Sequence, residues 1–411
     1  MRKQKNKWLI VAAAIGIHIS IGSVYAWSVL TRPIMEYLQC GLQEVTWIFS
    51  IAILFLGLSA GSLGTYVERL GPRRSGLIAT CCFTAGMLGS ALALSQRSLI
   101  MLYLAYGVIG GIGLGTGYIT PVSTLVKYFP NNRGLATGLA IMGFGFAGLI
   151  AAPVMQLLIA HFGLVQNFII MGSVYCLLML CSSLYLAPPP AHPLAQEPVS
   201  QNAKKRISIT LPDKRQFSVS EAMSTWQFKA LWWVFFTNIT CGIGLLAVAS
   251  PMAQEIIQMS PLAAASMVGI IGLLNGLGRI AWSTVSDYIG RANTYIAFFA
   301  LQIAAFYLLA QTADALIFQG LIFLIITCYG GGFSCMPAYL SDLFGTKQLS
   351  AIHGRILTAW GLAGIAGPLL LSVLYERTHS YAVTLYFFAT CFIVSLAVAL
   401  VLKCSKHKNL Q

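Results

Sequence analysis

Long apolar runs recur along the whole chain, and they restrict it to folds made of membrane-crossing helices. Of the 411 residues, 57% are hydrophobic and only 9% are charged, whereas soluble domains carry about 25% charged residues. About 20 apolar residues in a helix cross a hydrocarbon core, where backbone polar groups must bond to one another. The sequence therefore predicts an all-α membrane protein with twelve helices, near residues 8–30, 45–66, 74–95, 99–124, 134–161, 165–187, 227–250, 263–285, 292–312, 315–340, 350–376 and 380–402.

The predicted helices form two sets of six. A proline-rich and basic segment, residues 188–226, separates them and is typical of a linker, so we expect one half at 1–187 and another at 227–411. Glu68 and Gly71 recur 219 positions later as Asp287 and Gly290. Three other pairs lie 215 positions apart: Tyr118 and Phe333, Phe129 and Phe344, and Pro153 and Pro368. These shared spacings indicate an internal duplication.

The formal net charge of +14 is distributed in a way that does not require a nucleic-acid partner. If both termini lie in the cytoplasm, 21 of the 25 basic residues fall on the cytoplasmic side. This asymmetry follows the positive-inside rule, which predicts that orientation. We expect a multi-pass protein of a bacterial inner membrane, in contact with lipid and without nucleic acid. The first apolar stretch is long enough to remain as an uncleaved helix.

One arginine, Arg279, lies inside the apolar run "GLLNGLGRIAWSTVSD" of residues 272–287. A charge at mid-helix costs roughly 2.5 to 3.5 kcal/mol on insertion scales, so Arg279 should face protein or water. Asn275, four positions earlier, shares its helix face. The acidic residues fall at helix ends or in loops, so an anionic ligand is the expected counter-ion, and a guanidinium suits a carboxylate. The alternative is a guanidinium bonded to carbonyls and water that holds its helix in place.

The motif "GSLGTYVERLGPRR" at 61–74, its shorter repeat "DYIGRAN" at 287–293 and the two sets of six helices resemble the major facilitator superfamily. The resemblance implies two parallel six-helix halves and a gate on the cytoplasmic side. The gate would use the charges of these two turns: Glu68, Arg69, Arg73, Arg74, Asp287 and Arg291. A solvated turn that obeys the positive-inside rule is the alternative for the arginines.

Four further motifs, "GSVYAWSVLTRP", "YFPNNRGLATGLAIMGFG", "STWQFKALWW" and "GGGFSCMPAYLSDLFG", resemble the oxalate/formate antiporter family and its monocarboxylate-transporter relatives. This resemblance implies that Arg279 contacts the substrate. It also implies an aromatic chamber, for which ordinary packing is the alternative at each position: Tyr25, Trp27, Tyr118, Tyr329, Phe333 and Trp360. A second basic residue of the family falls on Trp360, which favours a monocarboxylate such as lactate, pyruvate or formate over oxalate.

These observations predict a secondary transporter that works by alternating access, as an anion exchanger or a proton symporter. His18, inside the first predicted helix, is a candidate proton relay, with packing or water-lining as its alternative. We expect no enzyme activity, cofactor or metal, because no nucleophile–base pair, Walker A motif or CxxC spacing occurs in the sequence. An exporter of an amphiphilic drug or metabolite and a non-transporting sensor remain alternatives, and a monomer is the superfamily default.

Overall fold

Helices make up the fold of the computed structural model, which describes residues 5–130, 132–189 and 216–408. They occur near the expected positions, which confirms the all-α fold class. Their bounds are α1 Lys7–Gly22, η1 Ser23–Ala26, α2 Trp27–Leu38, α3 Leu42–Ser95, α4 Leu99–Leu102, η2 Tyr103–Gly110, α5 Gly111–Tyr128, α6 Arg133–Phe162, α7 Leu164–Tyr185, α8 Val219–Ser224, α9 Trp226–Ile256, α10 Pro261–Ile289, α11 Arg291–Leu309, α12 Ala315–Phe344, α13 Leu349–Thr378 and α14 Tyr381–Lys408.

α3 joins two expected helices, 45–66 and 74–95, in one element that bends at Gly71. The φ of 78° and ψ of 168° at Gly71 interrupt the helix there, and a positive φ favours glycine because it has no Cβ. Pro72 follows where a missing N–H is tolerated. Eleven helical segments of the described residues are long and apolar enough to cross a membrane. One of them, Trp47–Ser95, contains the bend and therefore both crossings.

Two expected helices are less regular than the sequence suggests. The helix expected at 8–30 is divided by the 3₁₀ turn η1 and continues through α2 to Leu38. The helix expected at 99–124 contains the π-helical stretch η2 before α5. Gly107 in η2 packs directly against α3. A Cβ added at Gly107 would lie only 2.7 Å from the side chain of Ile51, so a larger residue would push the two helices apart. The close approach of α3 and η2 thus depends on tertiary packing, which the hydrophobic periodicity of the sequence does not reveal.

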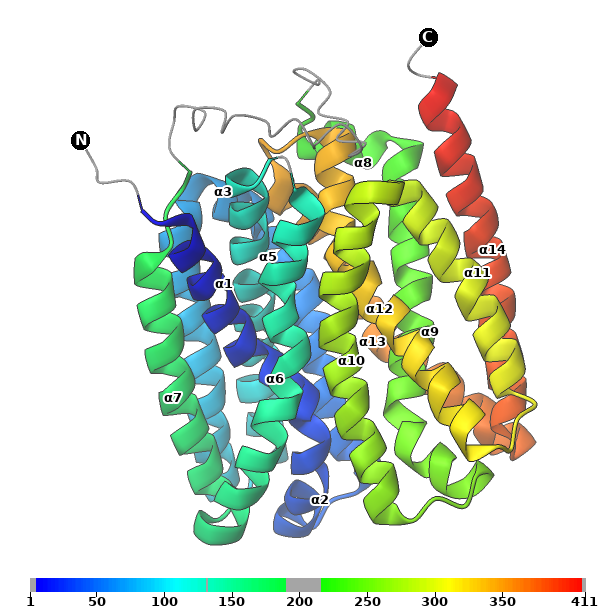
Figure 1. The fold of residues 1–411 in the computed structure, drawn as a ribbon. Coiled ribbons are helices and arrows are strands. Elements are labelled where there is room, and N and C mark those ends of the chain that lie inside the picture. The colour runs from blue at the N-terminus through cyan, green and yellow to red at the C-terminus, as the bar shows by residue number, and fades with distance from the viewer. Residues whose placement is uncertain (1–4, 131, 190–215, 409–411) are drawn as a thin grey trace.

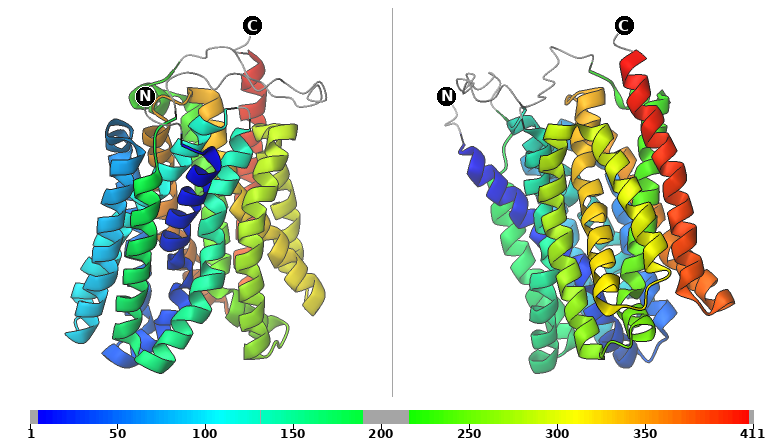
Figure 2. Two further views of the ribbon diagram at one scale, coloured as in Figure 1. Left: turned by 60° about the vertical axis from the view of Figure 1, so that its left-hand side comes forward. Right: turned by 45° about the vertical axis from the view of Figure 1, so that its right-hand side comes forward.

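The helices form two bundles that lie side by side, α1–α7 and α8–α14 (Figures 1 and 2). The start of α1, the end of α14 and the short α8 lie at one end of the molecule (Figure 1), which we name the terminal end. Most of the expected linker, 190–215, lies outside the described residues. The division into domains at 187 and 227 stays a prediction.

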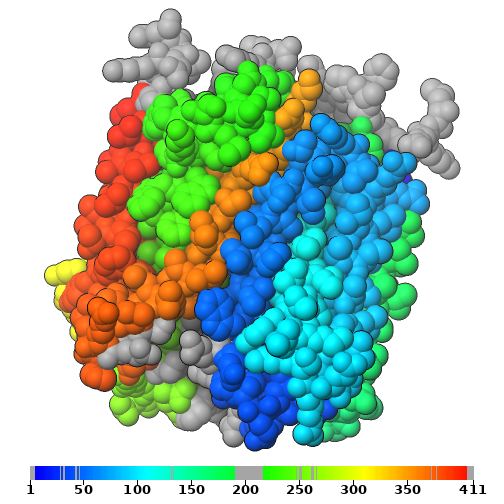
Figure 3. Space-filling view, turned by 180° about the vertical axis from the view of Figure 1, so that it is seen from behind, coloured from blue at the N-terminus to red at the C-terminus, as the bar shows by residue number. Residues whose placement is uncertain are grey.

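Two pairs of helices join the bundles at close range. In the pair of α3 and α13, which are neighbours in Figure 3, a Cβ added at Gly354 would lie 1.9 Å from the carbonyl oxygen of Ala60. In the pair of α6 and α10, a Cβ at Gly145 would lie 2.6 Å from Cα of Gly276. Small residues permit this backbone approach between helices. The packing brings α10, and with it Arg279, against the N-terminal bundle.

Candidate functional site

Arg279 is completely buried between the two bundles, with an exposed fraction of 0%. Its Nη1 donates to the carbonyl oxygen of Ile141 on α6 at 3.3 Å, and its Nε donates to Oδ1 of Asn275 at 3.4 Å. No carboxylate of the described residues forms an ion pair with it. The guanidinium therefore lies in protein, beside the asparagine that the sequence places on its face, and its positive charge is not neutralised there.

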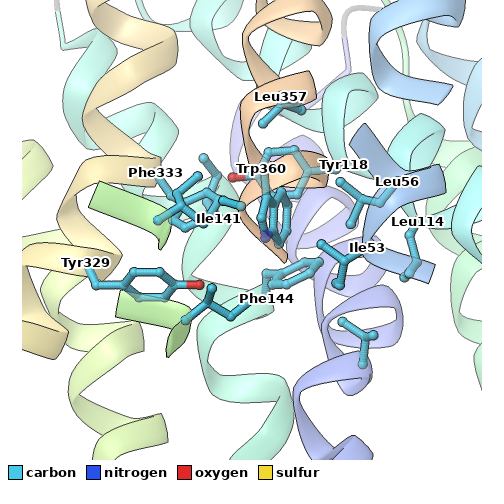
Figure 4. Close-up of a cluster of buried hydrophobic side chains, with 14 of the residues drawn as sticks. Ile53, Leu56, Leu114, Tyr118, Ile141, Phe144, Tyr329, Phe333, Leu357 and Trp360 are labelled. Atoms are coloured by element: carbon cyan, nitrogen blue, oxygen red, sulfur yellow. The ribbon is translucent and has the colours of Figure 1, made fainter. Parts of the chain in front are cut away.

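Two aromatic rings contact the guanidinium, and two further rings pack with them. The guanidinium carbon lies 5.5 Å from the ring centre of Phe144 and 5.1 Å from that of Phe333. Trp360 contacts both of these rings and Tyr118 as well, at centroid distances of 5.6, 4.7 and 5.3 Å (Figure 4). We name Arg279, Tyr118, Phe144, Phe333 and Trp360 the central cluster. The duplication partners Tyr118 and Phe333 thus meet through Trp360.

Three hydrogen-bond donors of the central cluster have no partner in the described part of the chain. They are Nη2 of Arg279, the hydroxyl of Tyr118 and Nε1 of Trp360, all buried. Buried donors are nearly always bonded, and leaving one unpaired costs about 1 to 3 kcal/mol. Because a guanidinium and an indole can only donate, an acceptor is what they lack. The cluster is chemically suited to a small anion with several acceptor oxygens.

Two tyrosines connect the bundles beside the central cluster. The hydroxyl groups of Tyr25 and Tyr329 lie 3.2 Å apart, and their rings contact Phe144 and Phe333 at 5.1 and 5.3 Å. In α12, Tyr329 precedes Phe333 by one helical turn and so lies further from the terminal end. This pair covers the central cluster on that side.

Trp27 lies apart from the central cluster, although the family resemblance assigns it to the chamber. It packs on Tyr106 with ring centres 4.5 Å apart, and Tyr106 in turn contacts Phe168. No ring contact in the described residues joins Trp27 to the rings around Arg279. A role for Trp27 at the substrate stays a prediction that this geometry does not support.

His18 connects three helices of the N-terminal bundle. Its Nδ1 lies close to the carbonyl oxygen of Ala140 on α6, and its Nε2 lies 3.2 Å from that of Tyr118 on α5. Its ring also packs on the Tyr118 ring at 5.3 Å. Both nitrogens therefore face carbonyl groups, a position that suits a structural link.

Sequence reasoning missed two buried residues at this site, Phe144 and His353. Phe144 contacts Arg279 only because α6 and α10 pack together, so no local pattern marks it. His353 packs against Tyr118 with ring centres 5.9 Å apart. The sequence does mark His353, because a titratable residue inside the predicted span 350–376 is itself a sign of function. Among the described residues, no group of three His, Cys, Asp or Glu side chains could hold a metal ion.

The two acidic residues of the duplicated turn bind opposite bundles at the terminal end. Glu68 accepts the backbone N–H of Ser350 at 2.7 Å, at the start of α13, and also pairs with Lys127 at 2.7 Å. Asp287 accepts the N–H groups of Gly134 and Leu135, each at 3.0 Å, at the start of α6. Carboxylates stabilise helix N-termini because free N–H groups and the helix dipole meet them there. Each acid thus fastens the first turn of a helix in the other bundle.

The arginines of the two turns differ from one another. Arg291 is 9% exposed and pairs with Asp287 at 2.5 Å and with Asp342 at 3.1 Å. Arg69, Arg73 and Arg74 are exposed and make no ion pair with a described residue. A gating role for these three stays a prediction, and the direct contacts between bundles come from the acids.

Comparison with known proteins agrees with this architecture. A model of the Major Facilitator Superfamily matches residues 11–315 and 231–411. The chain is 28% identical to the oxalate:formate antiporter of Oxalobacter formigenes, over 88% of this chain and 83% of the relative. It is 26% identical to monocarboxylate transporter 2 of Homo sapiens, over 95% of this chain and 84% of the relative. The crystal structure of the human organic anion transporter MFSD10 superposes with a TM-score of 0.74 at 17% identity, over 96% of this chain and all of that one. The protein therefore belongs to the major facilitator superfamily of multi-pass membrane transporters.

Proposed function

We propose that this protein is a secondary transporter of a small organic anion, a monocarboxylate of the formate, lactate or pyruvate class. The observation that carries the proposal is the guanidinium of Arg279, which is fully buried and pairs with no carboxylate of the described residues. A carboxylate would supply the missing negative charge. Its oxygens would also accept from Arg279, Tyr118 and Trp360, whose free donors belong to the same cluster.

A single negative charge suits this site better than two. The family resemblance places a second cation where this chain has Trp360, whose indole donates one hydrogen bond and carries no charge. At low dielectric, a second carboxylate charge would lose several kcal/mol of attraction without that cation. The rings of Phe144 and Phe333 lie against Arg279 and Trp360 packs on both, so the three rings would limit the size of the substrate.

The names of two relatives agree with this substrate class, since one is an oxalate:formate antiporter and the other a monocarboxylate transporter. They differ in whether the anion carries one or two charges, and the loss of the second cation at Trp360 favours the monocarboxylate. The coupling mode, exchange of anions or symport with a proton, is part of the proposal and is addressed below.

Transport would proceed by alternating access, with the two bundles rocking about the central cluster. At the terminal end, Glu68 and Asp287 hold the bundles together through the first turns of α13 and α6. Release of these bonds would open that end to Arg279. We place the terminal end in the cytoplasm and the protein in a bacterial inner membrane, on the distribution of basic residues in the sequence.

Uptake into proteoliposomes tests the proposal. Vesicles preloaded with unlabelled formate, lactate or oxalate are placed in the same labelled anion, and counterflow is measured for the wild type, Arg279→Gln and Lys229→Gln. Lys229 is exposed, so its variant controls for the loss of one positive charge. We expect counterflow of monocarboxylates that Arg279→Gln abolishes and Lys229→Gln retains.

Four outcomes would contradict the proposal. Full counterflow in Arg279→Gln would remove the binding site, and faster counterflow of oxalate than of formate or lactate would show that the argument from Trp360 is wrong. Transport of amphiphilic compounds without competition by carboxylates would indicate an exporter. Tight carboxylate binding without flux would indicate a sensor.

A further inference from the structure

A second buried histidine, His353 on α13, lies beside the central cluster and has no assigned role. Its exposed fraction is 0%, and neither ring nitrogen has a hydrogen-bond partner in the described part of the chain. Its ring centre lies 5.9 Å from that of Tyr118, whose hydroxyl also lacks a partner among the described residues. Buried imidazoles are normally bonded, so both nitrogens of His353 are available to a proton and its acceptor.

His18 provides the contrast within the same protein. Both of its ring nitrogens lie close to backbone carbonyl oxygens, those of Ala140 and Tyr118. A neutral imidazole uses one nitrogen as donor and keeps the other as acceptor. At His18 the second nitrogen is blocked by a carbonyl oxygen, whereas His353 keeps a nitrogen lone pair to which no described residue donates. Of the two histidines, His353 has the geometry of a proton acceptor.

A cavity lies at the start of α13, about one helical turn from His353 toward the terminal end. It measures about 100 Å³, and the residues that line it include Glu68, Lys127, Thr120, Ser123, Thr124 and Ser350. Ser350 precedes His353 by three residues on α13 and therefore lies on the same face. The hydroxyl of Ser350 donates to that of Ser123 at 2.5 Å. His353 thus lies one helical turn from a cavity that Ser350 lines, and its ring packs against Tyr118 of the central cluster.

Opening of the terminal end would separate the groups around His353. Its neighbour Gly354 packs on the carbonyl of Ala60 in α3, and Ser350 is bonded to Glu68 of α3 and to Ser123 of α5. Loss of these contacts would admit water to the His353 ring. Proton exchange at His353 would then be tied to the same movement that opens the anion site, which is a requirement of coupled transport.

We propose that His353 is the site at which a proton enters the transport cycle, so that the protein is a proton–monocarboxylate symporter. The inference rests on the proposed function. A hydronium ion in the opened cavity gives its proton to the free lone pair of His353, which forms an N–H bond and leaves water. On release, the N–H bond breaks and the proton returns to water. One anion and one proton then cross together.

The charged and titratable groups near His353 explain the coupling. Tyr118 faces it from α5, His18 of α1 packs on the same Tyr118 ring, and Glu68 and Lys127 line the cavity beyond Ser350. Arg279 adds a positive charge that its described neighbours do not neutralise. Because Tyr118 of the central cluster contacts the His353 ring, a carboxylate bound in that cluster would lie near His353, and its negative charge would favour the imidazolium. By linkage, protonation of His353 strengthens binding of the anion at Arg279 to the same degree.

Proteoliposomes that contain the full chain test the assignment by separating exchange from net uptake. Lactate counterflow measures anion movement without net proton flow. Uptake driven by an imposed gradient of about one pH unit, acidic on the side from which lactate enters, measures symport, for which one coupled proton permits about tenfold accumulation at equilibrium. The variants are His353→Gln, His18→Gln as a buried control and His379→Gln as an exposed control.

We expect wild type and His379→Gln to accumulate lactate about tenfold at that gradient, and His353→Gln to accumulate less than twofold. His353→Gln should retain at least about half of the counterflow, since it leaves Arg279 in place. If His353→Gln does not yield folded protein by size exclusion, His353→Asn replaces it. A pH dye inside the vesicles should record proton entry with lactate in wild type and none in the variant.

The outcomes separate this inference from the proposed function. Counterflow without gradient-driven uptake in wild type overturns the symport assignment but leaves anion transport intact. Undiminished gradient-driven uptake in His353→Gln, or its loss in His18→Gln alone, removes the role of His353. Absence of counterflow for all three anions in wild type refutes the proposed function itself.

Discussion

Two buried arginines of the C-terminal bundle, Arg279 and Arg291, are in opposite electrostatic situations. Arg291, at the terminal end, pairs with Asp287 and Asp342, and Asp287 in turn binds the first turn of α6. Arg279, in the central cluster, pairs with no carboxylate of the described residues and is surrounded by aromatic rings.

The difference teaches that similar burial can serve two purposes. A buried charge is tolerated when protein groups neutralise it, and removal of one member then leaves the others uncompensated. A buried charge without such a partner is a standing energetic cost, which a mobile counter-ion can relieve. We therefore expect substitutions at Arg291 to affect stability and substitutions at Arg279 to affect transport.

The largest effect is expected at Arg279. Arg279→Gln should lower kcat/KM for monocarboxylate uptake about 100-fold or more, because about 3 kcal/mol of charge-assisted bonding is lost. Its Tm in detergent without substrate should stay the same or rise, since an unneutralised charge is removed from the interior. A fall in Tm as large as that of the Arg291 variant would contradict the distinction.

Arg291→Gln should lower the free energy of unfolding by about 3 kcal/mol, because Asp287 and Asp342 lose their ion pairs with a buried guanidinium. Thermal unfolding in detergent measures this loss. Binding of lactate by the protein that remains folded should have an unchanged Kd. A higher Kd for lactate with unchanged stability would place Arg291 at the substrate and contradict the distinction between the two arginines.

The hydroxyl of Tyr118 offers a smaller test, because it is one of several donors in the cluster. Tyr118→Phe should raise KM for lactate about tenfold, as expected when one hydrogen bond to a charged group is lost, without lowering Tm. Tyr295→Phe is the matched control, since the Tyr295 hydroxyl donates to the carbonyl of Gly332 at 2.7 Å. That variant should lose about 1 kcal/mol of stability and keep the wild-type KM. Equal changes in KM in both variants would argue against a hydrogen bond from Tyr118 to the substrate.

The smallest effect is expected at Glu68, which fastens α13 at the terminal end. Glu68→Gln should weaken its bond to Ser350 and its pair with Lys127, and so favour opening of that end by about 1 kcal/mol. Ala351 is buried in the described state, so a cysteine placed there reports opening. Its labelling rate, after subtraction of labelling at the native cysteines, should be about fivefold higher in Glu68→Gln than in the protein with Glu68. Asp287→Asn should act in the same direction, because it fastens α6 in the equivalent way. No change in labelling for either variant would exclude these acids as closing contacts.

Much of the fold and part of the candidate site could be predicted because they depend on local spacing. Apolar runs located the helices, and the turn at Gly71 and Gly290 marked the duplication. The pairing of Arg279 with Asn275 follows from a separation of one helical turn. The lack of a hydrogen-bond partner for His353 among the described residues could not be predicted, because it depends on which polar groups the neighbouring helices place near the ring. The separation of Trp27 from the rings around Arg279 likewise depends on how α2 and η2 pack.

By itself, the sequence determined that this protein is a helical membrane protein with a duplicated plan and an arginine within one span. Those properties follow from hydropathy, helical period and charge, which act within one segment of the chain. Only the tertiary structure decided that the rings of Phe144 and Phe333 contact that arginine, that Tyr118 and Trp360 pack with those rings, and that no described carboxylate pairs with it. These are contacts between helices far apart in the chain, and their geometry is set by the small residues through which the two bundles meet.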